Sequence, residues 1–159
     1  MNEMSKFHTV RGYQLIEQNK KLLTPAMEDY LEMIFRNYFP EGYMRINTLA
    51  ELLNVAAPSA TKMVQKLSAL GLIDNKKYGV IFLTENGKEI GSYLLQRHNI
   101  IELFLKNIGV KEDLLIETEL VEHNISAQTL LKMNTFNKFF EHNPDFVKKY
   151  EIFAQYNMG

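Results

Sequence analysis

The stretch from Ile46 to Lys66, INTLAELLNVAAPSATKMVQK, predicts two short helices joined by a tight turn. In the first helix, which we expect to end at Leu53, apolar residues recur at the spacing that gives a helix one buried face. Residues 54–57 should form the turn, Pro58 suits the first turn of the second helix, and Gly71 suits its C-terminal cap. Two helices joined in this way are typical of a helix-turn-helix.

The segments on either side extend this unit to a winged helix. Downstream, Leu72-Ile73 is followed by a lysine-bearing stretch, a Tyr78-Gly79 turn and the apolar run from Val80 to Thr84, a pattern that indicates a β-hairpin. Upstream, Thr24-Pro25 is a strong helix start, because threonine caps a helix and proline at its first position loses no needed hydrogen bond. We therefore expect a DNA-binding winged helix with a small hairpin wing.

The second half of the chain has a helical pattern throughout. A long apolar helix should run from Glu85 to a break at residues 108–110, an acidic helix from about Lys111 to His123, and further helices after Ser126 and Pro144. This half carries more apolar surface than its helices can bury among themselves, so we expect a second copy of the chain as partner. The fold class is mainly α, and the expected organisation is an N-terminal extension of unknown role (1–23), a winged helix-turn-helix domain (24–90) and a helical dimerisation and metal-binding domain (91–159).

Composition narrows the functional classes. The 159 residues include no cysteine, which excludes disulfides and thiolate metal ligands. No apolar stretch approaches the roughly 20 residues of a membrane helix, and the N-terminus lacks a signal-peptide core, so we expect a cytoplasmic protein without membrane contact. The formal net charge of −1 argues against a protein that coats nucleic acid without regard to sequence.

The second helix of the helix-turn-helix carries polar side chains suited to reading DNA. Its apolar positions face inward, which leaves hydroxyl, amide and ammonium groups outward; lysines would contact phosphates, and Gln65 or Thr61 could reach base edges. Lys77 and Tyr78 would lie at the wing. The alternative is an ordinary surface helix with two lysines, but the turn and hairpin favour DNA binding. The predicted DNA-binding residues are Ser59, Thr61, Lys62, Gln65, Lys66, Lys77 and Tyr78.

Six carboxylates and imidazoles in three helical stretches form a candidate metal site. Residues three or four apart project from the same side of a helix, and His98 lies in an otherwise apolar helix. Each group alone has a simpler explanation. Three acidic residues close together on a helix usually face solvent, and a single histidine in an apolar helix is usually a core residue with its hydrogen bonds made. If the three helices packed together, a cation would offset the cost of burying the carboxylates. The candidate ligands are Asp29, Glu32, His98, Glu119, Glu122 and His123.

Four stretches carry a family likeness: TPAMEDYLE at 24–32, PSATKMVQKL at 58–67, Arg97-His98, and ELVEH at 119–123. Together they resemble the manganese transport regulator branch of the diphtheria toxin repressor family, over about residues 24–150. The resemblance implies a homodimeric repressor with Mn²⁺ as co-repressor, a palindromic operator, and a pair of ions held by the six candidate ligands. Iron-responsive relatives use a methionine and a cysteine where this chain has Asp29 and Glu119, and oxygen ligands suit the harder Mn²⁺. Residues 1–23 match no part of the family pattern.

The prediction is therefore an Mn²⁺-activated, sequence-specific repressor of metal homeostasis genes. One alternative is a winged-helix regulator that responds to Fe²⁺, another divalent ion or an organic effector. A more distant alternative is a di-metal carboxylate enzyme in a helical bundle. Such enzymes use two Glu-x-x-His pairs, whereas in this chain Glu122 and His123 are adjacent, so we do not expect an enzyme.

Overall fold

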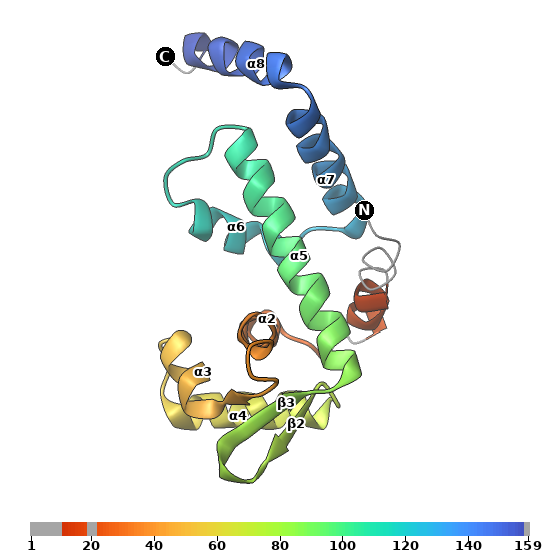
Figure 1. The fold of residues 1–159 in the computed structure, drawn as a ribbon, viewed down its shortest axis with the longest axis vertical. Coiled ribbons are helices and arrows are strands. Elements are labelled where there is room, and N and C mark those ends of the chain that lie inside the picture. The colour runs from red at the N-terminus through yellow and green to blue at the C-terminus, as the bar shows by residue number, and fades with distance from the viewer. Residues whose placement is uncertain (1–10, 19–21, 158–159) are drawn as a thin grey trace. The chain divides into compact units, whose positions relative to one another are not determined.

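A computed structural model describes residues 11–18 and 22–157 of the chain. The described residues form two compact units that divide between Gln96 and Arg97, within helix α5 (Glu85–Asn107). Figure 1 shows a small sheet beside helices α2, α3, α4 and the first half of α5 in the first unit, and helices in the second. The predicted mainly α fold with a small antiparallel wing is confirmed.

The helices of the first unit form where the sequence predicted them. Helix α2 (Pro25–Tyr38) begins at the Thr24 cap, whose side-chain oxygen accepts a hydrogen bond from the Met27 amide at 3.3 Å. Helices α3 (Ile46–Leu52) and α4 (Ala57–Ala69) make the helix-turn-helix. Their apolar faces, together with those of α2, the sheet and α5, form a core whose fully buried members include Leu31, Ile34, Leu49, Val64, Leu67, Leu72, Ile81, Ile90 and Leu94.

The wing is a hairpin of β2 (Ile73–Lys76) and β3 (Val80–Leu83), joined by the short 3-10 turn Lys77–Gly79. A third strand, β1 (Met44–Arg45), pairs antiparallel with β3, giving the order β1-β3-β2. Sequence patterning did not predict β1, because two residues are too few to show the alternation that marks a strand. This added strand attaches the wing to the start of α3.

Gly71 ends helix α4 as predicted. Its φ of +71° is a conformation that glycine adopts without strain, and its amide donates to the Ser68 carbonyl at 2.9 Å. The Leu72 amide donates to the Leu67 carbonyl at 3.1 Å, which completes a Schellman cap. The chain can then turn directly into β2.

Two close contacts hold the first half of α5 in this unit. A Cβ atom added at Gly91 would meet the Phe35 side chain of α2 at 2.7–2.9 Å, and one added at Gly12 would meet the Glu89 carbonyl at 2.4 Å. Gly12 belongs to helical residues 11–18, in which Ile16 is also buried. Part of the predicted extension therefore packs on α5, while residues 1–10 and 19–21 lie outside the described chain.

The second unit contains the end of α5 and helices α6 (Leu114–Glu122), α7 (Ala127–His142) and α8 (Pro144–Asn157). Helix α6 begins three residues later than the acidic pattern suggested, because Asp113 takes a left-handed φ of +53° and ends the preceding turn. Ser126 caps α7 as predicted, accepting from the Thr129 amide at 3.2 Å.

Aromatic stacking and a few buried polar bonds hold these helices together. Phe104 of α5 meets Phe136 of α7 edge-on at 5.4 Å between ring centroids, and Phe140 contacts Phe146 of α8 at 5.6 Å. Asn137 of α7 donates to the Ile100 carbonyl at 3.0 Å, satisfying a buried polar group. The α5–α7 packing thus fixes the second half of α5, from which His98 projects.

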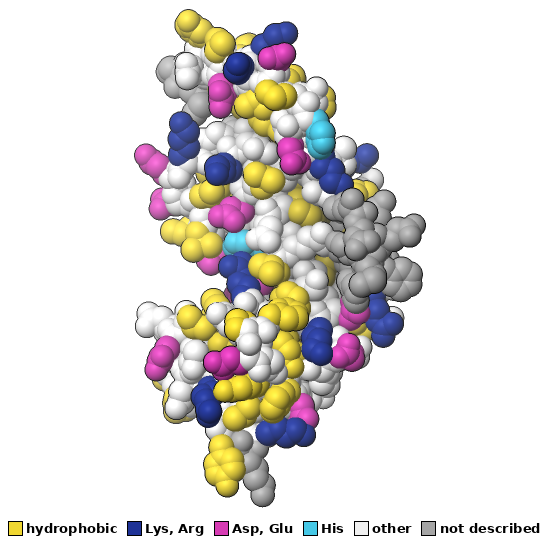
Figure 2. Space-filling view, viewed as in Figure 1, with side chains coloured by type: hydrophobic (Ala, Val, Ile, Leu, Met, Phe, Trp, Pro, Cys, Tyr) yellow, Lys and Arg dark blue, Asp and Glu magenta, His cyan; other side chains and the backbone are white. Residues whose placement is uncertain are grey.

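The second unit also exposes many large apolar side chains, some of which Figure 2 shows among charged ones. They include Leu103, Leu115, Ile116, Leu120, Leu131, Phe139, Ile152 and Phe153. Helix α8 has no buried residue in the single chain. Among the described residues, no helix combines the length and apolar character needed to cross a membrane.

Candidate metal centre and nucleic-acid interface

His98 and Glu122 form a buried imidazole–carboxylate pair in the second unit. His98 lies on α5 and Glu122 on the last turn of α6, and the His98 Nδ1 to Glu122 Oε2 distance is 2.9 Å. The residues are 5% and 2% exposed, so neither group is solvated to any extent. Because a carboxylate only accepts, the imidazole donates its Nδ1 proton. Two residues 24 positions apart in the sequence therefore meet as the predicted site requires.

The spacing of this pair suits a divalent ion. Adjacent ligands on an octahedral ion with bonds of about 2.1 Å lie about 3 Å apart, close to the distance found here. Imidazole and carboxylate donors without sulfur fit hard and borderline ions such as Mn²⁺. His98 would have to give up its Nδ1 proton to hold an ion through that atom, so binding would release a proton.

His123 lies beside the pair at the end of α6. Its Nε2 atom is 3.7 Å from Glu122 Oε1, and its Nδ1 atom is 3.3 Å from Nη2 of Arg97. Arg97 precedes His98 on α5 and is itself 5% exposed. The second unit therefore brings together three of the six predicted ligands and adds a buried guanidinium.

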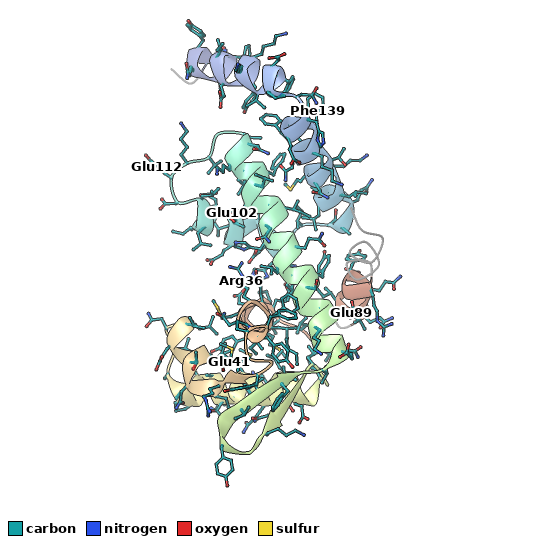
Figure 3. All side chains as sticks on the ribbon, viewed as in Figure 1. Arg36, Glu41, Glu89, Glu102, Glu112 and Phe139 are labelled. Carbon is teal, nitrogen blue, oxygen red and sulfur yellow. The ribbon has the colours of Figure 1, made fainter. Side chains whose placement is uncertain are left out.

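Two of the neighbouring groups were not among the predicted site residues. Arg97 appeared in the sequence only as half of the Arg97-His98 pair. Glu102, one turn after His98 on α5, has its Oε2 atom 3.9 Å from His98 Nε2, and Figure 3 shows its position on the helix. The four-residue spacing between His98 and Glu102 was the sequence signal that could have indicated this contact.

Glu119 is set apart from the buried pair. It lies one turn before Glu122 on α6, as the spacing predicted, but its side chain is exposed to solvent in the single chain. The structure therefore does not bury it with His98 and Glu122.

Asp29 and Glu32 lie on α2, in the first unit, one turn apart. Glu32 is buried and accepts hydrogen bonds from Arg36 at 3.2 Å from Nε and 2.7 Å from Nη2, which makes an ion pair within the helix. Figure 3 shows Arg36 on α2. The pair partly compensates the Glu32 charge.

Helix α4, the second helix of the helix-turn-helix, presents the expected polar residues. Ser59, Lys62, Gln65 and Lys66 are exposed, while Ala60, Val64 and Leu67 are buried on the opposite side. Thr61 is half-buried, and its hydroxyl donates to the Ala57 carbonyl at 3.0 Å. Thr61 would have to exchange this bond to donate to a base, so Gln65 is the better placed of the two predicted base readers.

The wing tip projects a single aromatic ring. Tyr78 is 94% exposed and takes a left-handed φ of +66°, followed by Gly79 at +70°. An exposed tyrosine in a turn of this kind suits contact with a sugar-phosphate backbone. Lys76 at the end of β2 pairs with Asp74 at 2.5 Å, and the side chain of the predicted Lys77 lies outside the described atoms.

Two models of known families match the chain, one after the other. Residues 22–81 match the iron dependent repressor N-terminal DNA binding domain, and residues 84–149 match the iron dependent repressor metal binding and dimerisation domain. The chain is 40% identical over 129 residues to the HTH-type transcriptional regulator MntR of Lysinibacillus sphaericus, covering 80% of this chain and 93% of that protein. It is 39% identical over 121 residues to MntR of Bacillus subtilis, covering 76% and 85%.

Solved structures give the same likeness. The manganese regulator SloR matches with a TM-score of 0.64 and 30% identity over 73% of this chain and 55% of that one. The metal-dependent transcriptional regulator MtsR matches with a TM-score of 0.65 and 28% identity over the same shares.

Proposed function

The chain belongs to the manganese transport regulator branch of the iron-dependent repressor family, and we propose that it responds to Mn²⁺. It is therefore a metal-responsive DNA-binding transcriptional repressor and not an enzyme. The observation that carries this proposal is the buried contact between His98 and Glu122, whose donor atoms have the type and spacing of adjacent ligands on one such ion. The resemblance to regulators named for manganese supports the choice of ion.

The proposed ligand set is Asp29, Glu32, His98, Glu119, Glu122 and His123, holding two ions in each subunit. The contacts of His98, Glu122 and His123 with one another support half of this set. Asp29 and Glu32 project from one side of α2, and Glu119 from the same side of α6 as Glu122. The proposed ligands thus lie on α2, α5 and α6 or directly after α6.

The resulting regulation is allosteric. A bound ion supplies positive charge that cancels the repulsion among the carboxylates, and the ligands on α2, α5 and α6 then favour one arrangement of the DNA-binding unit. In a homodimer, this arrangement would place two α4 helices about 34 Å apart, in successive major grooves of a palindromic operator. Ser59, Lys62 and Lys66 would contact phosphates, and Gln65 would read a base edge. We place this activity in the cytoplasm, at genes of metal homeostasis.

A gel-shift assay on a candidate palindrome tests the proposal directly. Operator binding should require Mn²⁺ and be reversed by a chelator. His98→Ala should weaken activation by Mn²⁺ on the order of 100-fold, because a ligand is lost. His142→Ala is the matched control, since this histidine is exposed on α7 and contacts only a backbone carbonyl among the interactions described here. Equal loss in both variants would contradict the ligand assignment.

Other measurements test the two alternative effectors, an organic molecule and Fe²⁺. Calorimetric titration with Mn²⁺ should show saturable binding that His98→Ala weakens; a regulator with an organic effector would show none. Parallel titration with Fe²⁺ under anaerobic conditions measures the preference between the two ions. Affinity alone generally ranks Mn²⁺ below Fe²⁺, so a functional preference for Mn²⁺ has to come from coordination number and geometry.

A further inference from the structure

Arg97 contacts a proposed ligand without being one. Its guanidinium lies 3.3 Å from Nδ1 of His123, and both residues belong to the second unit, on α5 and directly after α6. Arg97 is 5% exposed and the His123 side chain 14%, so water competes little for this contact. The hydrogen bond therefore constrains the histidine strongly.

The contact assigns a role to one ring nitrogen of His123. A guanidinium has donors but no acceptor, so Nδ1 must accept. Neutral His123 then carries its proton on Nε2, which points towards Glu122 Oε1 at 3.7 Å. With one nitrogen accepting from Arg97 and the other protonated, neither lone pair of His123 is available to an ion.

His98 is in a different state. Its Nδ1 atom donates to Glu122, so in the neutral ring the proton lies on Nδ1. The two histidines beside Glu122 are therefore unequal in the metal-free chain, and the difference arises from the neighbour of each Nδ1 atom: a carboxylate for His98 and a guanidinium for His123.

We infer that Arg97 is a positioning residue that holds His123 out of the ligand set until the guanidinium is displaced. This inference rests on the proposed function, in which His123 is a ligand. For His123 to bind through Nδ1, the hydrogen bond to Arg97 must break; for it to bind through Nε2, the proton must first leave that atom. In the metal-free state Arg97 also places a positive charge beside His123, whose other ring nitrogen lies 3.7 Å from Glu122. Arg97 thus raises the metal concentration at which the repressor is activated.

The first test needs no variant and no metal. Nitrogen-15 NMR of the metal-free, full-length wild-type protein, with His123 assigned by comparison with His123→Ala, distinguishes protonated from unprotonated ring nitrogens. The expected result is a neutral ring protonated at Nε2. A ring protonated at Nδ1, or at both nitrogens, would overturn the inference.

The second test measures Mn²⁺ affinity by calorimetry in matched variants. Arg97→Met removes both the charge and the hydrogen bond while keeping an unbranched side chain, and should tighten Mn²⁺ binding by about tenfold, the effect of losing one hydrogen bond from a charged donor. Arg97→Gln keeps a donor for Nδ1 without the charge and should tighten binding less. Thermal unfolding of each metal-free variant checks that it is folded, and Arg97→Gln serves as the test if Arg97→Met is not.

A double-mutant cycle with His123→Ala separates the hydrogen bond from general electrostatics. If Arg97 acts through His123, Arg97→Met should change Mn²⁺ affinity much less in the His123→Ala background than in the wild type. Equal tightening in both backgrounds would mean that only the charge matters, and unchanged or weaker binding in Arg97→Met would mean that the residue merely supports the fold; either result overturns the inference. Failure of the wild-type protein to bind Mn²⁺ would instead refute the proposed function, and the NMR measurement would still report whether Arg97 holds His123.

Discussion

Single donor atoms decide which metal a site of this type prefers. Asp29 and Glu119 stand where iron-responsive relatives, by the resemblance, carry sulfur. The double variant Asp29→Met with Glu119→Cys should shift activation from Mn²⁺ towards Fe²⁺, because thioether and thiolate ligands favour softer ions. Gel shifts with each metal measure the preference. Glu117→Cys, an exposed acidic position on the same helix, is the control, and an unchanged preference in the double variant would contradict the assignment.

We also expect individual residues of α4 to have different roles, some contacting bases and others contacting phosphates. Gln65→Ala should reduce the affinity ratio between operator and random DNA, since an amide can pair with a base edge. Lys66→Ala should weaken binding to both and lower the slope of log affinity against log salt by about one, since one phosphate contact is lost. Salt-series titrations of both variants on both DNAs provide the measurement. Parallel losses on the two DNAs in both variants would refute the division.

At the scale of elements, α5 is the helix on which the arrangement depends. Its first half packs on α2 through the contact of Gly91 with Phe35, and its second half carries Arg97 and His98. Gly91→Leu should destabilise the DNA-binding unit by about 1–3 kcal/mol, because the added side chain overlaps the Phe35 ring. Chemical denaturation measures the loss. Adding Phe35→Ala should restore part of it; no restoration would mean that the clash lies elsewhere.

For the whole molecule, metal and dimerisation should be separate requirements. The apolar side chains exposed on the second unit, such as Leu115, Ile116 and Leu120 on α6, favour association whether or not a metal is bound, since burying them needs no ion. A chelator should therefore abolish operator binding while leaving a dimer of unchanged mass. Sedimentation velocity with and without chelator, beside gel shifts on the same samples, makes the comparison. Dissociation to monomers on chelation would show instead that metal controls assembly.

The sequence by itself determined the winged helix, because each of its features is local: the Thr24 cap, the apolar spacing of α3 and α4, the Gly71 stop and the apolar run of β3. It also determined which residue types could bind a hard ion, since that follows from side-chain chemistry. The strand β1 was not predictable because its partner, β3, lies more than 30 residues away.

Only the tertiary structure decided which neighbours each candidate ligand has. It buried Glu122 against His98, left Glu119 exposed, and set Arg97 against His123. Helical spacing gives the direction of a side chain around its own helix axis, but not which residue of a second helix comes opposite it; that depends on how α5 and α6 pack. Those packing contacts give the Nδ1 atoms of the two histidines different neighbours, a carboxylate for His98 and a guanidinium for His123.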